Sequence, residues 1–389
     1  MNEWKTYRIG DICKRVCSGG TPKSTEPSYY DGEIPWLNTK EINFNRISST
    51  EKHITLSGLE NSSAKWIDKN SVIVAMYGAT AAKVAINTIP LTTNQACCNL
   101  SIDETKADYR FVYYWLCSRY TELASLANGG AQQNLNAQQI KDFEIKLPEI
   151  QTQQKIADLL WSIDNKIICN KSINDNLEQQ AQAAFNNIIA QYSECETINL
   201  SEIAVLNPKR AIAKGTLARS IEMAQLPTSG SFPAGWDMKE YNGGMKFQNG
   251  DTLMARITPC LENGKVAYIN FLEENEVAFG STEYIVIASK GAIAPEVFYF
   301  LTRHNDFVDF AVKNMNGSSG RQRVSAETIG TYKLPIISPE DMFILETIAK
   351  EALKKIKYNS LENIRLSEIR DTLLPKLMSG ELKINNLDC

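Results

Sequence analysis

Apolar and polar positions follow two different patterns along this chain. Short runs bounded by glycine or polar loops, such as 71–75 and 251–255, have the composition and length of β-strands. Two long stretches without glycine, 151–192 and 339–377, instead repeat apolar residues at helical spacing. The pattern therefore predicts two mixed segments of strands and short helices, each followed by one long helix.

The second half of the chain restates the first at an offset of about 190 residues. The matching segments are, in chain order, 7–12 and 198–203, 71–75 and 251–255, 83–85 and 265–267, 93–96 and 281–284, 109–126 and 295–312, 128–136 and 316–323, and 146–148 and 333–335. We therefore expect two similar domains that share one fold.

The two helical stretches carry heptad rows of the kind that form a coiled-coil seam. In the first stretch the rows are Ile156, Ile163, Asn170, Leu177 and Ala184, and Leu160, Ile167, Asn174, Ala181 and Ile188. The same register moved forward by 189 residues gives Leu345, Ala352, Asn359, Leu366 and Leu373, and Ala349, Ile356, Asn363, Arg370 and Leu377. A buried asparagine in an apolar seam fixes the alignment of the helices at a cost in stability. We predict that the helices pair through Asn170, Asn174, Asn359 and Asn363, and that packing loosens toward Arg370.

These patterns predict an α+β protein with a pseudo-twofold internal repeat. The first domain is expected over 1–150 and the second over 197–338, with spacer helices over 151–196 and 339–389. The two helices are expected to form an antiparallel coiled coil. A helix of about 40 residues is roughly 60 Å long at about 1.5 Å per residue, so it would hold the two domains at a fixed spacing.

Composition narrows the class of protein. A length of 389 residues with 43% hydrophobic residues is ordinary for a globular chain of two or three domains. No run approaches the roughly 18 to 20 apolar residues of a membrane span, and the N-terminus lacks a signal-peptide pattern, so we expect a cytoplasmic protein. Nine cysteines, two histidines and no Cys-x-x-Cys indicate reduced, buried thiols and no metal site.

The net charge of −4 weighs against a free-standing nucleic-acid binder, because phosphate contacts usually leave a basic footprint. Two stretches are nevertheless locally basic. They contain Lys209, Arg210, Lys214, Arg219, Lys239, Lys246, Arg256 and Lys265, and then Lys313, Arg321, Arg323 and Lys333. These residues either form a binding surface or belong to a solvated surface of mixed charge, and the sequence leaves both interpretations open.

The chain lacks the motifs of the enzymes that would suit such a domain arrangement. Asn207-Pro208 continues with two basic residues, unlike the Asn- or Asp-Pro-Pro-aromatic tetrapeptide that holds a flipped adenine. Gly264-Lys265 is followed by Val266 and lacks the earlier glycine of a phosphate-binding loop. His53 and His304 stand in no recognisable catalytic setting. We therefore expect a non-catalytic protein; a coiled-coil scaffold that binds other proteins fits the heptads equally well.

Three segments resemble the specificity subunit of type I restriction–modification systems, and the likeness extends over essentially the whole chain. The segments 18–23 (SGGTPK) and 30–36 (YDGEIPW) are similar to the opening of many target-recognition domains in that family. The segment 373–381 (LLPKLMSGE) resembles the family's C-terminal signature. The resemblance implies two target-recognition domains that each read one half of a bipartite site in double-stranded DNA, and helices that set the spacing between the halves.

The resemblance also implies partners. Two methyltransferase (M) subunits would dock on the helices, and restriction (R) subunits would join them. This chain would bind no cofactor itself, because S-adenosylmethionine, ATP and Mg²⁺ would be held by the partner subunits. The specificity subunit of a related two-subunit restriction system is an alternative, since that difference lies in the partner. The second domain has Asn207-Pro208-Lys209-Arg210 where the first has Gly19-Gly20-Thr21-Pro22, so we expect an asymmetric target.

Polar loops that can approach a duplex supply the candidate DNA-binding residues, because base edges are read by side chains with paired donors or acceptors. In the first domain they are Gly19, Gly20, Thr21, Lys23, Tyr77, Thr80, Lys83, Gln132 and Gln133. In the second they are Arg256, Thr258, Asn263, Lys265, Ser318, Ser319, Arg321, Gln322 and Arg323. Arg321 and Arg323 are the strongest candidates, whereas Trp36 and Trp236 are expected to be packing residues.

Overall fold

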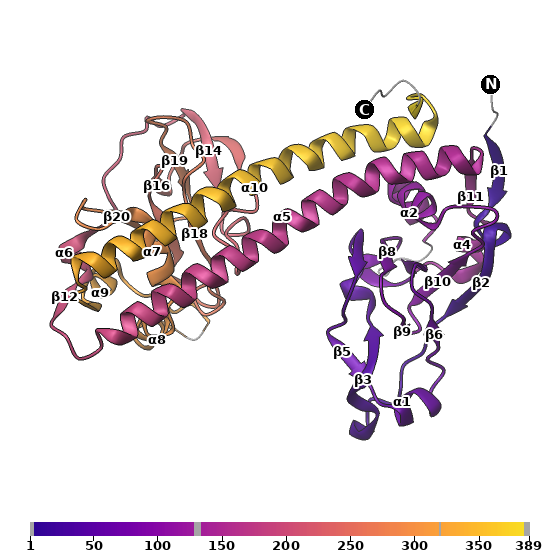
Figure 1. The fold of residues 1–389 in the computed structure, drawn as a ribbon, viewed down its shortest axis with the longest axis horizontal. Helices are drawn as coiled ribbons and strands as arrows, with labels where there is room; N and C mark the ends of the chain where they lie inside the picture. Colours follow the sequence, from indigo (N-terminus) through magenta and orange to yellow (C-terminus); the bar gives the residue numbers. More distant parts are fainter. Residues whose placement is uncertain (1–3, 128–133, 319, 385–389) are drawn as a thin grey trace. The chain divides into compact units, whose positions relative to one another are not determined.

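The computed structural model describes residues 4–127, 134–318 and 320–384, and these divide into two compact units. Unit 1 contains the described residues up to Asn165 together with those from Leu366 onward, and unit 2 runs from Lys166 to Arg365. Each unit combines β-sheets with helices and takes a part of both long helices (Figure 1). The fold is therefore of the α+β class.

The larger sheet of unit 1 has five strands in the order β2–β10–β7–β8–β4. The strands are Cys13–Ser18 (β2), Asn45–Ile47 (β4), Val72–Ala75 (β7), Val84–Asn87 (β8) and Cys97–Ile102 (β10). All pairs are antiparallel except β4 with β8. Every residue of β7 is buried, which explains why this segment is a continuous apolar run and not an alternating one.

Two further sheets and several short helices complete unit 1. A four-stranded sheet has the order β5–β3–β9–β6, with β3 and β9 parallel, and β1 pairs with β11. The strands are Lys5–Arg8 (β1), Tyr30–Leu37 (β3), Lys52–Ile54 (β5), Trp66–Ile67 (β6), Leu91–Thr93 (β9) and Glu144–Leu147 (β11). The α-helices are Leu56–Glu60 (α1), Tyr109–Ser118 (α2), Tyr120–Ser125 (α3) and Ala137–Asp142 (α4), and the 3₁₀ turns are Ile9–Ile12 (η1), Pro27–Tyr29 (η2), Thr39–Glu41 (η3) and Gly78–Thr80 (η4).

Unit 2 has the same kinds of element. One four-stranded sheet is ordered β13–β20–β17–β18, another is ordered β15–β14–β19–β16, and β12 pairs with β21. The strands are Thr197–Asn199 (β12), Ala204–Leu206 (β13), Leu217–Ile221 (β14), Asp237–Glu240 (β15), Met245–Phe247 (β16), Thr252–Ala255 (β17), Val266–Tyr268 (β18), Ala278–Gly280 (β19), Tyr284–Ser289 (β20) and Lys333–Pro335 (β21). The short helices are Leu200–Ile203 (α6), Pro295–Thr302 (α7), Asn305–Lys313 (α8) and Ala326–Gly330 (α9).

The two units repeat one topology. The order β2–β10–β7–β8 of unit 1 corresponds to β13–β20–β17–β18 of unit 2, and β5–β3–β9–β6 corresponds to β15–β14–β19–β16. The central pair of each second sheet is parallel in both units. Strand β4 extends the larger sheet of unit 1 and has no counterpart among the described strands of unit 2.

One sequence match between the repeats is shifted by two residues in the structure. The two Lys-Leu-Pro tripeptides suggest that Leu147 corresponds to Leu334. However, Ile9 N donates to Phe143 O, and Leu200 N donates to Tyr332 O, in the equivalent turns. Counting forward from these bonds places Ile336, and not Leu334, at the position of Leu147. A proline can occupy β21 because this strand belongs to a two-stranded sheet and needs few ladder bonds.

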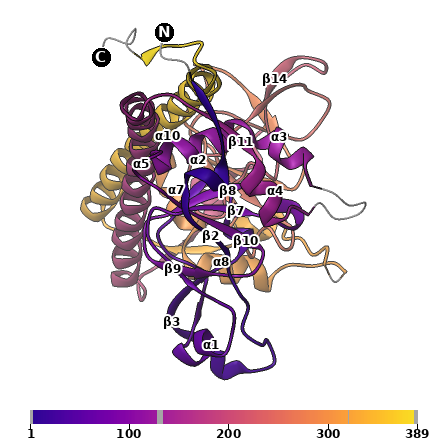
Figure 2. The same ribbon diagram turned by 90° about the vertical axis from the view of Figure 1, so that its right-hand side faces the viewer.

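The two long helices are Ile150–Gln191 (α5) and Pro339–Ser379 (α10). In unit 1 the first turns of α5 and the last turns of α10 join one core with α2, which lies between α5 and the strands β7 and β8 (Figure 2). The buried side chains of this junction include Phe111, Val112, Trp115, Ile156, Leu160, Leu377 and Met378. The helix pair is thus built into the unit and does not merely connect to it.

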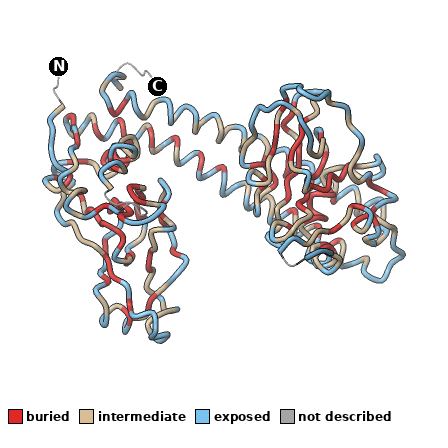
Figure 3. Tube along the Cα trace, turned by 180° about the vertical axis from the view of Figure 1, so that it is seen from behind, coloured by how far each residue is buried: buried red, intermediate tan, exposed pale blue. Residues whose placement is uncertain are grey.

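In unit 2 the end of α5 and the start of α10 run antiparallel beside α7 (Figure 1). The predicted seam residue Ala184 is only half-buried, whereas its neighbour Phe185 is 1% exposed. The reason is that this part of α5 also packs against α7, so its buried face is wider than a two-helix seam. Figure 3 shows the buried residues gathered in the sheets and along the inner faces of the helices in each unit.

Candidate nucleic-acid interface

Two loops that lie far apart in sequence meet in unit 2. One follows β17 and contains Arg256 and Thr258, and the other contains Gln322 and Arg323. Thr258 N donates to Gln322 O at 3.1 Å, and Gln322 N donates back to Thr258 Oγ1 at 3.1 Å. Ile257 and Arg323 form an isolated antiparallel bridge. The structure therefore brings the two groups of candidates in this domain together at one place.

Arg256 and Arg323 share a carboxylate that was not among the predicted site residues. Arg323 donates from Nε to Glu283 Oε2 at 2.9 Å and from Nη2 to Oε1 at 2.8 Å, while Arg256 Nε donates to Oε2 at 3.2 Å. These bonds, led by those from Arg323, lower the pKa of Glu283, so the cluster keeps one negative and two positive charges at neutral pH. Glu283 was missed because an acid is not expected at a DNA-binding surface.

The remaining candidates of unit 2 differ in their freedom to contact a ligand. Arg321, Asn263 and Ser318 are exposed, whereas Lys265 donates from Nζ to Met223 O at 2.6 Å and is half-buried. The amine of Lys265 is thus bonded to a backbone carbonyl of its own unit. Ser319 lies outside the described residues.

The loop pair of unit 2 has an equivalent in unit 1. Tyr77 and Asn134 form an isolated bridge that corresponds to the bridge between Ile257 and Arg323. Leu135 N donates to Met76 O at 2.8 Å, as Val324 N donates to Arg256 O at 3.0 Å. Met76 N donates to Ala96 O, as Arg256 N donates to Glu283 O. The positions of Arg256, Glu283 and Arg323 are therefore filled by Met76, Ala96 and Asn134 in unit 1.

The other candidates near this loop pair of unit 1 are Tyr77, Thr80 and Lys83. Tyr77 is exposed at 43%, and Thr80 is half-buried. Lys83 donates from Nζ to Asn43 Oδ1 at 2.8 Å. Gln132 and Gln133 lie outside the described residues. Tyr77 is thus the most accessible candidate of this group that the structure describes.

Gly19 and Gly20 are buried at positions where the domain has no room for a side chain. A Cβ on Gly19 would lie 2.0 Å from Thr93 O, and one on Gly20 would lie 2.3 Å from Ala64 N. Gly20 N donates to Thr93 O at 2.9 Å, and Trp36 Nε1 donates to Gly20 O at 2.9 Å. The close backbone approach that these glycines allow is to the chain itself.

Thr21 and Lys23, which follow these glycines, are exposed, and the Thr21 hydroxyl donates to the amide oxygen of Gln95. The tryptophans behave as packing residues. Trp36 is 4% exposed, and the half-buried Trp236 stacks on Phe271 with ring centroids 4.6 Å apart.

Much of the basic stretch that begins at Lys209 is neutralised by acids. Arg210 donates from Nε to Asp251 Oδ2 at 3.0 Å, and this ion pair is largely buried. Arg219 pairs with Glu276, and Lys239 Nζ lies 3.2 Å from Glu222 Oε1. These bonds are structural, so the local excess of basic residues in the sequence overstates the positive surface.

The predicted helix-pairing asparagines meet in a polar layer between α5 and α10. Asn170 donates from Nδ2 to Asn363 Oδ1 at 2.9 Å and to Glu362 Oε2 at 2.6 Å. Asn359 donates from Nδ2 to Asn174 Oδ1 at 2.8 Å. These pairs set one antiparallel register in unit 2. The participation of Glu362 was not predicted, because the heptad rows count only positions on the seam itself.

Arg370 lies where the seam residues Leu366 and Leu373 are only half-buried, so the apolar packing is looser there. Arg370 donates from Nη1 to Asp164 Oδ1 at 3.0 Å, and the other carboxylate oxygen accepts from the Tyr114 hydroxyl at 2.5 Å. Arg46 from β4 lies over Trp161 of α5, with its guanidinium carbon 3.3 Å from the ring centroid. Polar contacts therefore replace the apolar seam at this end and attach the helices to unit 1.

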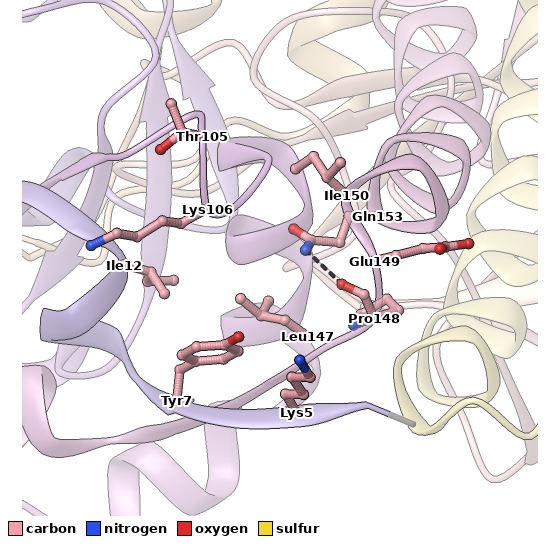
Figure 4. Close-up of a pocket in the computed structure, with 10 residues that line it drawn as sticks. All are labelled: Lys5, Tyr7, Ile12, Thr105, Lys106, Leu147, Pro148, Glu149, Ile150 and Gln153. Atoms are coloured by element: carbon pink, nitrogen blue, oxygen red, sulfur yellow. Dashed lines mark hydrogen bonds between the residues drawn. The ribbon is translucent and has the colours of Figure 1, made fainter. Parts of the chain in front are cut away.

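A pocket in unit 1 opens between β1, the loop at Lys106 and the start of α5 (Figure 4). Two of its polar side chains bind the chain itself: Gln153 Nε2 donates to Pro148 O at 2.9 Å, and Lys106 Nζ donates to Asp11 O at 2.9 Å. None of the ten residues that line the pocket is a serine, cysteine or histidine.

The corresponding place in unit 2 is also a pocket, but its lining is apolar. Its walls include Ile198, Ile203, Ile293, Ile336 and Met342. Met342 stands where unit 1 has Gln153, so the two units present different chemistry at the same point of the fold.

Within the described ranges, no three histidine, cysteine or acidic side chains gather as a metal site. His304 precedes α8 and packs against Phe185, with ring centroids 5.8 Å apart. Burial raises the pKa of the Cys13 and Cys98 thiols to about 12 in each case. These cysteines therefore remain protonated thiols at neutral pH.

None of the helices in the described part of the chain combines the length and the apolar character that a membrane crossing requires.

The fold defines a protein with an internal duplication. It has two α+β units, and each unit contains a part of both long helices. Residues 1–179 match the family described as "Type I restriction modification DNA specificity domain". The specificity subunit of the type I restriction enzyme MjaIX from Methanocaldococcus jannaschii is 24% identical, over 99% of this chain and 95% of that protein. The HindI specificity subunit from Haemophilus influenzae is 21% identical, over 98% of this chain and all of that protein. The chain is thus similar over nearly its whole length to type I restriction–modification specificity subunits, and its first 179 residues match the family model.

A solved structure extends the likeness to the arrangement of the elements. The crystal structure of the type I restriction–modification S subunit from M. genitalium matches with a TM-score of 0.63 at 20% identity, over 96% of both chains. At this level of identity the match establishes a shared fold.

Proposed function

We propose that this chain is the DNA-recognition subunit of a type I restriction–modification complex. The observation that carries the proposal is the loop pair that occurs at the same position in both units. The family model that matches is named for DNA specificity. Two domains that recognise different DNA sequences need the same backbone arrangement with different side chains on it. Unit 1 presents Tyr77 and Asn134 at this place, and unit 2 presents Arg256 and Arg323.

Each unit is proposed to read one half of a bipartite, asymmetric site. An asparagine amide pairs best with adenine, and an arginine guanidinium pairs best with guanine, so Asn134 and Arg323 favour different bases. Arg321, Thr21 and Lys23 are exposed and are suited to contact phosphates or base edges. The two halves of the target are therefore expected to differ.

The paired helices α5 and α10 are proposed to act as a coiled-coil spacer that sets the distance between the half-sites and docks two methyltransferase subunits. Support comes from the polar layer, which fixes the register, and from apolar side chains that remain exposed along the helices. These are Ile168, Ile173, Tyr358, Leu361 and Ile369. Exposed apolar side chains on a helix pair favour contact with further helices.

The bond chemistry is assigned to the partners. Methyltransferase subunits would flip and methylate one adenine in each half-site with their own S-adenosylmethionine, and restriction subunits would use ATP and Mg²⁺. This chain is proposed to be non-catalytic and to bind no cofactor. Its overall acidity suits a subunit whose partners supply much of the phosphate neutralisation.

The proposal is tested by mapping N6-methyladenine across the genome of the source cell, with and without this gene. Loss of one two-part asymmetric motif is expected, and restoring the gene should restore that motif alone. Restriction activity then distinguishes the assembly with R subunits from the related two-subunit system. An unchanged methylation map, with the M subunits shown to be expressed, would favour a protein-binding scaffold instead.

A further inference from the structure

The carboxylate of Glu283 holds one edge of the Arg323 guanidinium. An arginine has five N–H donors in a rigid planar fork. In Arg323, Nε and one hydrogen of Nη2 are taken by Glu283, and one hydrogen of Nη1 is taken by Arg321 O at 3.1 Å. Among the described residues, no further acceptor binds the second hydrogen of Nη1 or of Nη2. Glu283 leaves open the end of the guanidinium between Nη1 and Nη2, its outer edge, and the side chain is 40% exposed.

The fold itself does not need this cluster. At the equivalent positions unit 1 has Met76, Ala96 and Asn134, which are uncharged. In unit 2 the backbone bonds from Arg256 N to Glu283 O and from Val324 N to Arg256 O, both 3.0 Å, already join the loops. An acid beside a DNA-binding loop also repels phosphate, so its presence requires a reason other than affinity.

We infer that Glu283 is a specificity-determining positioning residue, which fixes Arg323 so that its outer edge reads a guanine in the half-site of unit 2. This inference rests on the proposed function. Two parallel donors on one edge match the O6 and N7 acceptors of guanine in the major groove. A guanidinium locked by a second carboxylate contact loses less rotational freedom on binding, and it is aimed at one base pair. Arg256 supports the arrangement from the other side of the carboxylate.

A phosphate oxygen pair has the same acceptor chemistry as a guanine edge, and the two predict different behaviour. A guanine contact makes the effect of Glu283 specific to one base pair. A phosphate contact makes the effect of Glu283 uniform over all sequences, and a variant that loses this contact shows a smaller salt dependence of binding.

The experiment uses the full chain assembled with its methyltransferase subunits, and duplexes that carry the mapped target or single base-pair changes within it. Binding and methylation are measured for the natural chain, for Glu283→Gln and for Arg323→Lys. Both variants are expected to lose discrimination by about tenfold at the same G·C pair. Discrimination in the half-site of unit 1 should not change.

Glu276→Gln is the matched control, because Glu276 also pairs with an arginine of unit 2 but lies away from the loop pair. Thermal unfolding of each assembly separates misfolding from altered reading. A uniform loss of affinity with a smaller salt dependence, or unchanged discrimination with a lower melting temperature, would overturn the inference. If the natural chain itself shows no sequence preference, the proposed function fails; if it does and Glu283→Gln matches it, only the positioning role fails.

Discussion

Asn359 donates a hydrogen bond from Nδ2 to Oδ1 of Asn174, 2.8 Å away, across the helix pair of unit 2. Asn359 is 1% exposed, so this bond cannot be exchanged for water. The Asn174 side chain in turn donates to Ser360 Oγ at 3.2 Å. The helices are therefore held in one register by groups that would be unsatisfied in any other.

Replacing one asparagine of this pair should destabilise the protein. Asn359→Ala leaves the partner amide without its donor, and we expect the free energy of unfolding to fall by about 1–3 kcal/mol. Urea denaturation of the purified chain measures the change. Asn176→Ala is the control, because Asn176 is exposed on α5, the helix that carries the partner Asn174, and should change stability by less than about 0.5 kcal/mol. If the two substitutions lower the free energy of unfolding equally, the polar layer has no special role in pairing the helices.

Glu178 of α5 should make unit 2 more stable in mild acid. Burial raises the pKa of this carboxyl above its ordinary value of 4.5, and the hydrogen bond from the Tyr299 hydroxyl and the charge of Arg303 oppose that rise only in part. The folded state thus favours the protonated form, so the stabilising contribution is present below pH 4.5 and is lost as the pH rises through the higher folded value.

Glu178→Gln removes this pH dependence. We expect the variant to be more stable than the natural chain at neutral pH, with the difference disappearing near about pH 4. Urea denaturation at several pH values checks this, with the exposed Glu351→Gln as the control. A variant that is less stable at neutral pH would mean that the attraction between Glu178 and Arg303 outweighs the effect of burial.

Gly20→Ala should destabilise unit 1 before any DNA is present. The added methyl group would lie 2.3 Å from Ala64 N, which is backbone and cannot swing away, so we expect a loss of about 1–3 kcal/mol. Gly10→Ala should cost less, since its new neighbour is 3.3 Å away on the Lys141 side chain. Thermal unfolding without DNA measures both. An unaltered melting temperature together with weaker DNA binding would make Gly20 a contact residue after all.

Adding seven residues to both α5 and α10 should lengthen the recognised gap. The insertions go between Asn165 and Lys166 and between Arg365 and Leu366, where one unit passes into the other and the network of Glu178 is left intact. One heptad adds about 10 Å of helix, or roughly three base pairs, and preserves the phase of the seam. Methylome mapping reads the new gap. A heptad placed in one helix alone should instead impair assembly, and an unchanged gap in the double insertion would exclude the spacer role.

Periodicity revealed the parts of the fold that depend on long regular patterns. The repeat and the two long helices could be predicted because many positions contribute to each signal. The sequence did not predict that Phe185, and not Ala184, is buried on α5. The reason is that helix α7, which widens the buried face of α5, comes from a distant part of the sequence. The two-residue shift that places Ile336 at the position of Leu147 in the repeat was not predicted. The identical Lys-Leu-Pro tripeptides suggested a different alignment of the repeats from the one that the backbone hydrogen bonds give.

The candidate site was predicted only in part, for the same physical reason. The loops with Arg256 and Arg323 were identified from composition, but their meeting at Glu283 depends on contacts across 27 and 40 positions of the chain. Arg210 was counted as available charge, although Asp251 binds it through a contact that sequence alone does not disclose. Charge patterns along a chain do not reveal which acids and bases are neighbours in space.

The division of unit 1 between the two ends of the chain has a consequence for biosynthesis. Leu377 and Met378 are fully buried among residues made at the very start of translation, such as Ile9 and Ile12. A ribosome adds about 200 residues between Asn165 and Leu366, which takes roughly 10–40 s. The first repeat to be synthesised is therefore the last to close, and until then its open core is a substrate for chaperones while the second repeat can already be complete.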